Sequence, residues 1–136
     1  KLNQKWKKGD VIELNLPMPV ELMEANPLVE EVKNQIAVKR GPLVYCLESD
    51  QLPAKTSVND IALNVNSKFT TNNFTLNNRN LVSIDAEAVI KSDNSWNKTL
   101  YKPLNSKDAT AVPVKLIPYF AWGNKGKGEM TVWMSH

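Results

Sequence analysis

Asp85 and Glu87 are the first candidates for chemistry, because both carboxylates project from one side of a predicted strand. Residues 81–90, LVSIDAEAVI, alternate between apolar and polar side chains, which is typical of a half-buried strand. Paired carboxylates act as general acid and base in some enzymes and as calcium ligands in others. Exposed acids are also the norm on the solvent face of a sheet. We therefore favour a solvated face, and expect Asp85, Glu87 and Lys115 to face solvent.

Two tryptophans are candidate carbohydrate contacts, because sugars stack on flat, exposed aromatic rings. Trp96 lies in a polar loop, and Trp122 lies at the corner of a predicted hairpin. Tryptophan is highly buried on average, so packing of each ring under a loop is the alternative.

The chain has one cysteine, Cys46, and one histidine, His136, so it can form neither an internal disulfide nor a His/Cys zinc site. Cys46 lies in a run that is apolar on both faces of a strand, and should behave as a small buried hydrophobe. We predict no catalytic residue in this chain. Arg40 lies at a Gly-Pro corner, where it either fixes the bend or faces a ligand; we favour the structural role.

A glycine-rich segment, residues 123–128, has the spacing GxxGxG. It separates two apolar runs, residues 117–122 and 129–134, and this arrangement predicts a hairpin. No helix is expected after it, so a phosphate-binding loop is not favoured.

The elements that position these residues are about ten short strands with turn signals every 8–12 residues. Residues 36–38 and 43–47 are the most apolar, and the second run is expected at the centre of a sheet or between two layers. Residues 11–16 alternate like a strand, and residues 28–33 predict a single helical turn at most. The predicted fold is an all-β antiparallel β-sandwich, with a jelly roll as one variant and an OB-type barrel as the alternative. The predicted core includes Val44, Cys46, Ile84, Ala86, Val132 and Met134.

Length and charge narrow the class of protein. A chain of 136 residues fits one domain, residues 1–136, although residues 1–24 alternatively form the end of a preceding β-sandwich. The net charge of +3 comes from lysines near the start, without the clustered basic face of a nucleic-acid binder. No apolar run approaches the ~20 residues that span a bilayer, so neither nucleic acid nor membrane is an expected partner. The first residues do not resemble a signal peptide, and the pattern begins as if cut from a longer chain.

Several motifs carry a resemblance to a known family. They are Trp6-x-x-Gly9-Asp10, Leu16-Pro17-Met18, Asn26-Pro27, Ala37-Val38-Lys39-Arg40-Gly41-Pro42-Leu43-Val44-Tyr45-Cys46-Leu47-Glu48, Ile117-Pro118-Tyr119-Phe120-Ala121-Trp122-Gly123-Asn124, and Gly128-Glu129-Met130-Thr131-Val132-Trp133. In order and spacing they resemble the C-terminal part of bacterial β-L-arabinofuranosidases of glycoside hydrolase family 127, once a domain of unknown function. Residues 50–108 are not diagnostic.

The resemblance implies an N-terminal (α/α)6 catalytic barrel with a zinc-bound cysteine nucleophile and a nearby glutamate, followed by β-sandwich domains. Nothing here matches that barrel, and Cys46 falls in the β-sandwich motif, so neither the catalytic cysteine nor the zinc cofactor carries over. The implied function is a non-catalytic accessory domain, not an enzyme by itself, of a parent glycoside hydrolase. A carbohydrate-binding module and an OB-like nucleic-acid binder are the alternatives.

The expected partners follow from the same interpretation. They are the missing catalytic domain, a glycan, and a second copy of the chain meeting it through the region of Trp6 or the corner 119–122. A glycan-degrading parent favours a periplasmic or extracellular location.

Overall fold

The computed structural model describes residues 3–91, 99–101, 110–124 and 126–136, and this part of the chain is built mainly from strands. In it, no helix is long and apolar enough to cross a membrane. The strands are β1 (Val20–Glu24), β2 (Gln35–Arg40), β3 (Leu43–Glu48), β4 (Ile61–Leu63), β5 (Thr70–Leu76), β6 (Arg79–Ile90), β7 (Thr110–Pro118), β8 (Met130–Thr131) and β9 (Met134–Ser135). Short 3-10 turns are η1 (Glu30–Val32), η2 (Ser49–Gln51), η3 (Val58–Asp60) and η6 (Tyr119–Ala121). The all-β prediction is confirmed.

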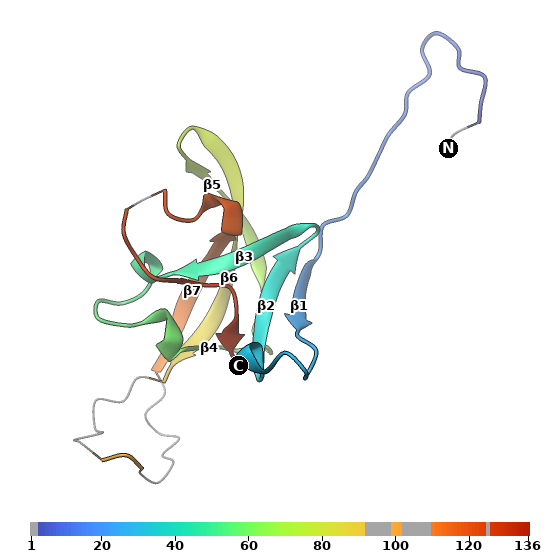
Figure 1. Ribbon diagram of the computed structural model, residues 1–136. Helices are drawn as coiled ribbons and strands as arrows, with labels where there is room; N and C mark the ends of the chain where they lie inside the picture. Colours follow the sequence, from blue (N-terminus) through green and yellow to red (C-terminus); the bar gives the residue numbers. More distant parts are fainter. Residues whose placement is uncertain (1–2, 92–98, 102–109, 125) are drawn as a thin grey trace.

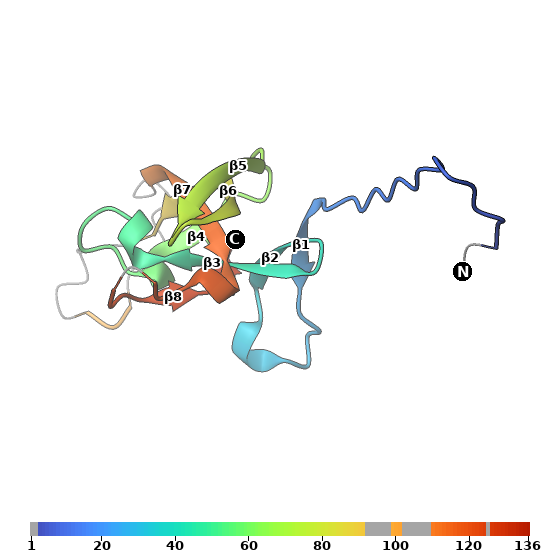
Figure 2. The same ribbon diagram turned by 90° about the horizontal axis from the view of Figure 1, so that it is seen from above.

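Six of the strands pair in a closed ring. Following the hydrogen-bonded neighbours leads from β2 to β3, β7, β6, β4, β9 and back to β2. Every pairing in the ring is antiparallel except the short parallel contact of β4 with β9. The other three strands are appended, with β1 on β2, β5 on β6 and β8 on β3 (Figures 1 and 2). Closure leaves no free edge within the ring, which is how barrels avoid edge-to-edge association.

The main core lies inside this ring, because all six ring strands contribute buried apolar side chains to one cluster. A second, smaller cluster lies on the outer face, where η6 and the β5–β6 hairpin cover β3 and β7. The strand residues of the main cluster are Ile36, Val38, Tyr45, Leu47, Ile61, Leu63, Ile84, Ala86, Ala88, Val114, Leu116 and Met134.

Strand β3 is buried on both faces, as the apolar run predicted. Tyr45 and Leu47 belong to the main cluster, whereas Cys46 belongs to the outer one. The Tyr45 hydroxyl donates a hydrogen bond to the Val82 carbonyl of β6 at 3.0 Å, so this buried polar atom is satisfied. Burial raises the pKa of Tyr45, and the nearby Arg40 guanidinium partly opposes the shift.

The corner between β2 and β3 is a two-residue turn. Gly41 has a φ of 56°, the left-handed conformation that glycine adopts without strain, and Pro42 follows it. A Cβ on Gly41 would lie 3.0 Å from two side-chain atoms of Met18. Arg40 lies at the same corner, with Nη1 3.9 Å from the Met18 sulfur. This placement supports a structural role for Arg40.

The predicted register of β6 is confirmed, with one adjustment. Ile84 and Ala86 face the core, and Glu87 is exposed with Lys115 on the neighbouring strand. Asp85 is only partly exposed, because Asn72 of β5 donates a 2.7 Å hydrogen bond to its carboxylate and the other carboxylate oxygen is buried. Asp85 was predicted to face solvent. It lies on the predicted face of β6, but its side chain is only partly exposed.

The core prediction holds for Cys46, Ile84, Ala86 and Met134, all of which are buried. Val132 is partly buried against the outer cluster. The core prediction is wrong for Val44, because 44% of this residue is exposed. It shares the outer face of β3 with Cys46, but lies at the end of the strand beside the β2–β3 turn.

Residues 3–19 form an arm without regular secondary structure, and the predicted strand at 11–16 is wrong. Figures 1 and 2 show that this arm extends away from the ring. Residues 11–16 pair with no strand of the described chain, so their alternating pattern remains exposed.

The predicted hairpin at the end of the chain is also wrong. After β7 the chain turns through η6, and β8 then pairs with β3 instead of β7. The two apolar runs, residues 117–122 and 129–134, therefore contribute to strands on opposite edges of β3. The prediction for residues 28–33 is confirmed, since they contain only the single turn η1. Residues 70–90 form the β5–β6 hairpin, whose turn at Asn77 and Asn78 has positive φ at both residues.

Two positions of β3, Val44 and Leu47, provide a matched test of the core. Replacing fully buried Leu47 by alanine should lower the free energy of unfolding by about 2–5 kcal/mol, through lost burial and a residual cavity. Val44→Ala, at a half-exposed position, should cost about 1 kcal/mol or less. Urea titrations followed by circular dichroism measure both; equal costs would contradict the assignment of the interior face.

Candidate functional site

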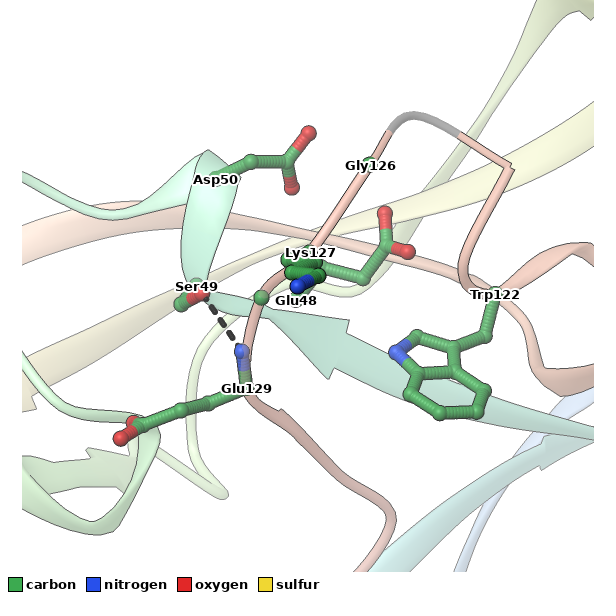
Figure 3. Close-up of a pocket in the computed structure, with 8 residues that line it drawn as sticks. Glu48, Ser49, Asp50, Trp122, Gly126, Lys127 and Glu129 are labelled. Carbon is green, nitrogen blue, oxygen red and sulfur yellow. Dashed lines mark hydrogen bonds between the residues drawn. The ribbon is translucent and has the colours of Figure 1, made fainter.

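The candidate site is an open surface pocket at the C-terminal end of β3, on the outer face of the ring (Figure 3). Three segments meet there: the end of β3 with η2, the corner after η6, and the glycine-rich segment before β8. The residues that line it are Glu48, Ser49, Asp50, Trp122, Gly126, Lys127, Gly128 and Glu129.

The base of the pocket is held by reciprocal hydrogen bonds between Ser49 and Glu129. The Ser49 amide donates to the Glu129 carbonyl at 3.0 Å, and the Glu129 amide donates to the Ser49 hydroxyl at 3.0 Å (Figure 3). Gly128 fits closely here, because a Cβ there would lie 3.0 Å from the Ser49 hydroxyl oxygen and would require that side chain to shift. Of the glycines described in this segment, Gly128 is the one that lies close to another segment, whereas Gly123 and Gly126 have open space around them.

The Glu129 carboxylate is engaged elsewhere. It accepts hydrogen bonds from the Ser57 hydroxyl at 2.8 Å and from the Val58 amide at 3.3 Å. In Figure 3 this side chain points away from Trp122. Its role is to anchor η3 to the strand that follows the pocket, not to face a ligand.

Glu48 is the buried acid of the pocket. It ends β3 on the same face as Cys46, and only 6% of it is exposed. Its Oε1 accepts a hydrogen bond from the Gly123 amide at 3.1 Å, which ties the corner after Trp122 to β3. A charged acceptor makes this a strong contact.

Trp122 forms one wall and is 44% exposed. Its backbone is held by Asn124, whose amide group donates to the Ala121 carbonyl at 2.9 Å and to the Trp122 carbonyl at 3.4 Å. Asn124 also accepts a 3.5 Å hydrogen bond from Asn77 in the β5–β6 turn. The half-exposed indole is therefore carried on a fixed corner.

The polar groups at the mouth of the pocket are Asp50 and Lys127, both exposed. An aromatic face beside a carboxylate and an ammonium group offers stacking, hydrogen-bond acceptors and hydrogen-bond donors together. The cavity that these groups border is about 30 Å³, which is room for a water molecule and not for a sugar ring. The groups do not form a nucleophile with an adjacent general base.

Among the described residues, Trp122 is the predicted carbohydrate contact, and it lines this pocket. Trp96 lies outside the described residues. Asp85 and Glu87 lie on the outer face of β6 and do not line this pocket. Sequence reasoning missed Glu48, Asp50 and Lys127; the only signals were an acid closing the most apolar strand and the glycine-rich segment near Trp122.

Cys46 is unsuited to covalent chemistry or to metal binding. Burial raises the pKa of the Cys46 thiol to about 12, and the neighbouring Glu48 charge adds to the shift. A cysteine binds zinc as its thiolate, and no three His, Cys, Asp or Glu side chains of the described chain gather into a group that could hold a metal ion. These residues do not fit the zinc that the family resemblance implies for the catalytic barrel.

The raised pKa of Cys46 predicts a dependence of stability on pH. In the unfolded chain the thiol ionises near its ordinary pKa of about 8.5, whereas the folded thiol stays protonated up to about pH 12. Unfolding thus releases a proton within this range, and stability falls as pH rises from about 9 toward 12, by up to about 1.4 kcal/mol per pH unit. Cys46→Ala should remove that part of the slope. Identical slopes in urea titrations of both proteins between pH 9 and 11 would contradict it.

The fold and the pocket together define a small all-β domain whose polar groups gather at a surface site. Residues 20–135 match the sequence profile of the "Glycoside hydrolase family 127 C-terminal domain". The chain belongs to this family.

Relatives support the same assignment. The chain is 33% identical over 131 residues to a "Non-reducing end beta-L-arabinofuranosidase" of Bifidobacterium longum, covering 91% of this chain and 20% of that protein. A solved structure titled "Glycoside hydrolase" is 47% identical, with a TM-score of 0.86 over 98% of this chain and 22% of its own. A GH127 β-L-arabinofuranosidase from Geobacillus stearothermophilus T6 is 34% identical, with a TM-score of 0.77 over 88% of this chain and 18% of its own. The chain thus spans about a fifth of the length of these relatives.

Proposed function

We propose that this chain is a non-catalytic accessory domain of a longer glycoside hydrolase that acts on β-L-arabinofuranosides. The relatives, whose names carry that activity, are about five times longer than the region they share with this chain. One observation carries the proposal. The ring closes on itself, whereas residues 3–19 form an arm whose apolar side chains are exposed and which contacts the ring at Met18 and Pro19.

The arm is attached to the ring at one point. Beside the contacts of Met18 with the β2–β3 turn, the Gly41 amide donates a 3.4 Å hydrogen bond to the Pro19 carbonyl. Beyond that point the apolar side chains are exposed: Trp6 by 48%, Ile12 by 60%, Leu14 by 76% and Leu16 by 71%. The arm also precedes residue 20, where the family profile begins.

An exposed, alternating and extended segment is suited to strand addition, in which main-chain hydrogen bonds form to a sheet edge and alternate side chains fill pockets. We therefore assign the arm to the preceding part of the longer protein, where it would add to a sheet and fix this domain in place. The isolated chain lacks that partner, and a second copy is the nearest substitute.

The arm thus predicts self-association of the isolated chain. Light scattering should show an apparent mass that rises with concentration. The triple variant Ile12→Ser, Leu14→Ser, Leu16→Ser should remain monomeric, because the apolar surface is removed without touching the ring core.

Leu28→Ser is the matched control, since Leu28 is 88% exposed but lies between β1 and β2, outside the arm. This control should associate like the parent chain. A triple variant that associates unchanged would show that the arm is not the contact surface, and would leave the exposed corner of Tyr119, Phe120 and Trp122 as the alternative.

The proposal also predicts no turnover of an aryl β-L-arabinofuranoside by this chain. Its only cysteine is buried with a protonated thiol. Release of the aryl group at the rate of the buffer control is expected. Turnover that is lost in Cys46→Ala would overturn the non-catalytic assignment.

Zinc and the reacting groups would then belong to the preceding barrel of the parent. A glycan is the partner expected for the whole protein, and glycan breakdown favours a periplasmic or extracellular location. Nucleic acid and membrane lipid have no place in this proposal.

A further inference from the structure

We infer that the groove between η6 and the tip of the β5–β6 hairpin docks against the preceding part of the same longer protein, which supplies apolar side chains and a carboxylate. The groove is open, has a volume of about 330 Å³, and its lining includes Leu76, Asn77, Arg79, Leu81, Phe120 and Asn124. A 3.5 Å hydrogen bond from Asn77 to Asn124 joins its two sides. The identity of the partner rests on the proposed function, whereas the docking surface rests on the geometry below.

The first argument is an apolar cluster that this chain covers only in part. The outer cluster has three buried members, Cys46, Ile117 and Ala121, and the apolar residues packed against it remain partly exposed. Phe120, directly beside Ala121 in the chain, belongs to neither core cluster and is 58% exposed. Contiguous exposed apolar surface with a polar rim is typical of a contact with another protein surface.

The second argument is the composition of this surface. Residues 73–82 and 117–124 contain one charged side chain, Arg79, although 23% of the whole chain is charged. The second of these segments exposes three aromatic residues, Tyr119, Phe120 and Trp122. The cores of protein interfaces are depleted in lysine and acidic residues and enriched in aromatic residues and arginine. The composition therefore favours a protein contact.

Arg79 determines the charge of the partner. It is exposed at the start of β6, and no ion pair joins it to another residue in the part of the chain that the structure describes. A guanidinium group pairs with a carboxylate through two parallel hydrogen bonds, and this pairing is stronger where apolar contacts exclude water. We therefore expect an acidic side chain flanked by apolar side chains on the partner.

The third argument identifies the partner by continuity with the arm. Val44 directly precedes the first residue of β3 that pairs with β7, and Tyr119 directly follows the partner of that residue, Pro118. Val44 is 44% exposed and Tyr119 is 50% exposed, so half-exposed apolar side chains extend from the β2–β3 turn, where Met18 holds the arm, toward the groove.

In Figure 1, β5 and the base of the arm lie at the same upper end of the ring. The family profile describes a C-terminal domain, so the rest of a longer protein precedes this chain and enters at that end. About four-fifths of the length of the relatives lies outside the region that they share with this chain. The preceding part of the protein is therefore the occupant that the position of the groove favours.

The test is hydroxyl-radical footprinting of the isolated chain and of the longer protein, with oxidation of single side chains measured by mass spectrometry. Tyr119 and Phe120 should be oxidised at least about fivefold more slowly in the longer protein, because docking would bury side chains that are half exposed in this chain. Leu28, which is 88% exposed between β1 and β2, is the internal control and should react equally in both proteins.

Charge reversal at the two ends of β6 provides a matched pair of variants. In the longer protein, Arg79→Glu should raise the oxidation of Tyr119 and Phe120 at least about threefold, because a like charge then faces the partner carboxylate. Lys91→Glu, an exposed position just beyond the other end of β6, should leave both rates unchanged. Neither variant should change these rates in the isolated chain. Phe120→Ser, with oxidation measured at Tyr119, tests the same contact if Arg79→Glu does not fold.

Three results would overturn the inference. They are equal oxidation of Tyr119 and Phe120 in the two proteins, protection that neither Arg79→Glu nor Phe120→Ser weakens, and an equal effect of these variants in the isolated chain, which would show a role within this domain. Protection of the longer protein that is lost on dilution would also overturn it, because a second copy would then be the occupant.

The same experiment reports on the arm separately, through the oxidation of Trp6 and Leu14. Protection of the arm without protection of the groove would contradict this inference and leave the proposed function intact. Protection of the groove without protection of the arm would support this inference and contradict the proposed docking of the arm.

Discussion

The structure depends on one constraint: β3 must pair on both edges while burying both faces. Its pairings with β2 and β7 close the ring, and β8 pairs with its far end. Tyr45 and Leu47 fill the interior, and the hydrogen bond from Tyr45 to Val82 connects β3 to β6 across it. Cys46 is therefore enclosed on the opposite face, which explains why the pKa of its thiol is raised to about 12.

The local elements were largely predictable from the sequence, because alternation and turn residues act over short distances. The β6 register and the two strands around Gly41 follow from such patterns. Ring closure was not predictable, since no local pattern states that β9 lies between β2 and β4. The hairpin prediction for 117–134 failed for the same reason: β3 competed for both runs and paired with each of them.

The candidate site was predictable only in part. Trp122 could be selected because tryptophan is a common sugar contact and lies beside a glycine-rich segment. Glu48, Asp50 and Lys127 could not be assigned to it, because they come from segments about 75 residues apart along the chain that meet only when β8 pairs with β3. Val44 shows the converse error, in which an apolar residue of the central strand lies at its exposed end.

The central claim is that the ring folds independently and that the arm joins it to the rest of a longer protein. Hydrogen–deuterium exchange of the isolated chain, at concentrations low enough to keep it monomeric, and of the longer protein tests this most directly. Amides of β2, β3, β6 and β7 should be protected to a similar degree in both, whereas those of residues 11–16 should exchange rapidly in the isolated chain and slowly in the longer protein. Rapid exchange of the arm in both proteins, or loss of protection in the ring of the isolated chain, would contradict the account.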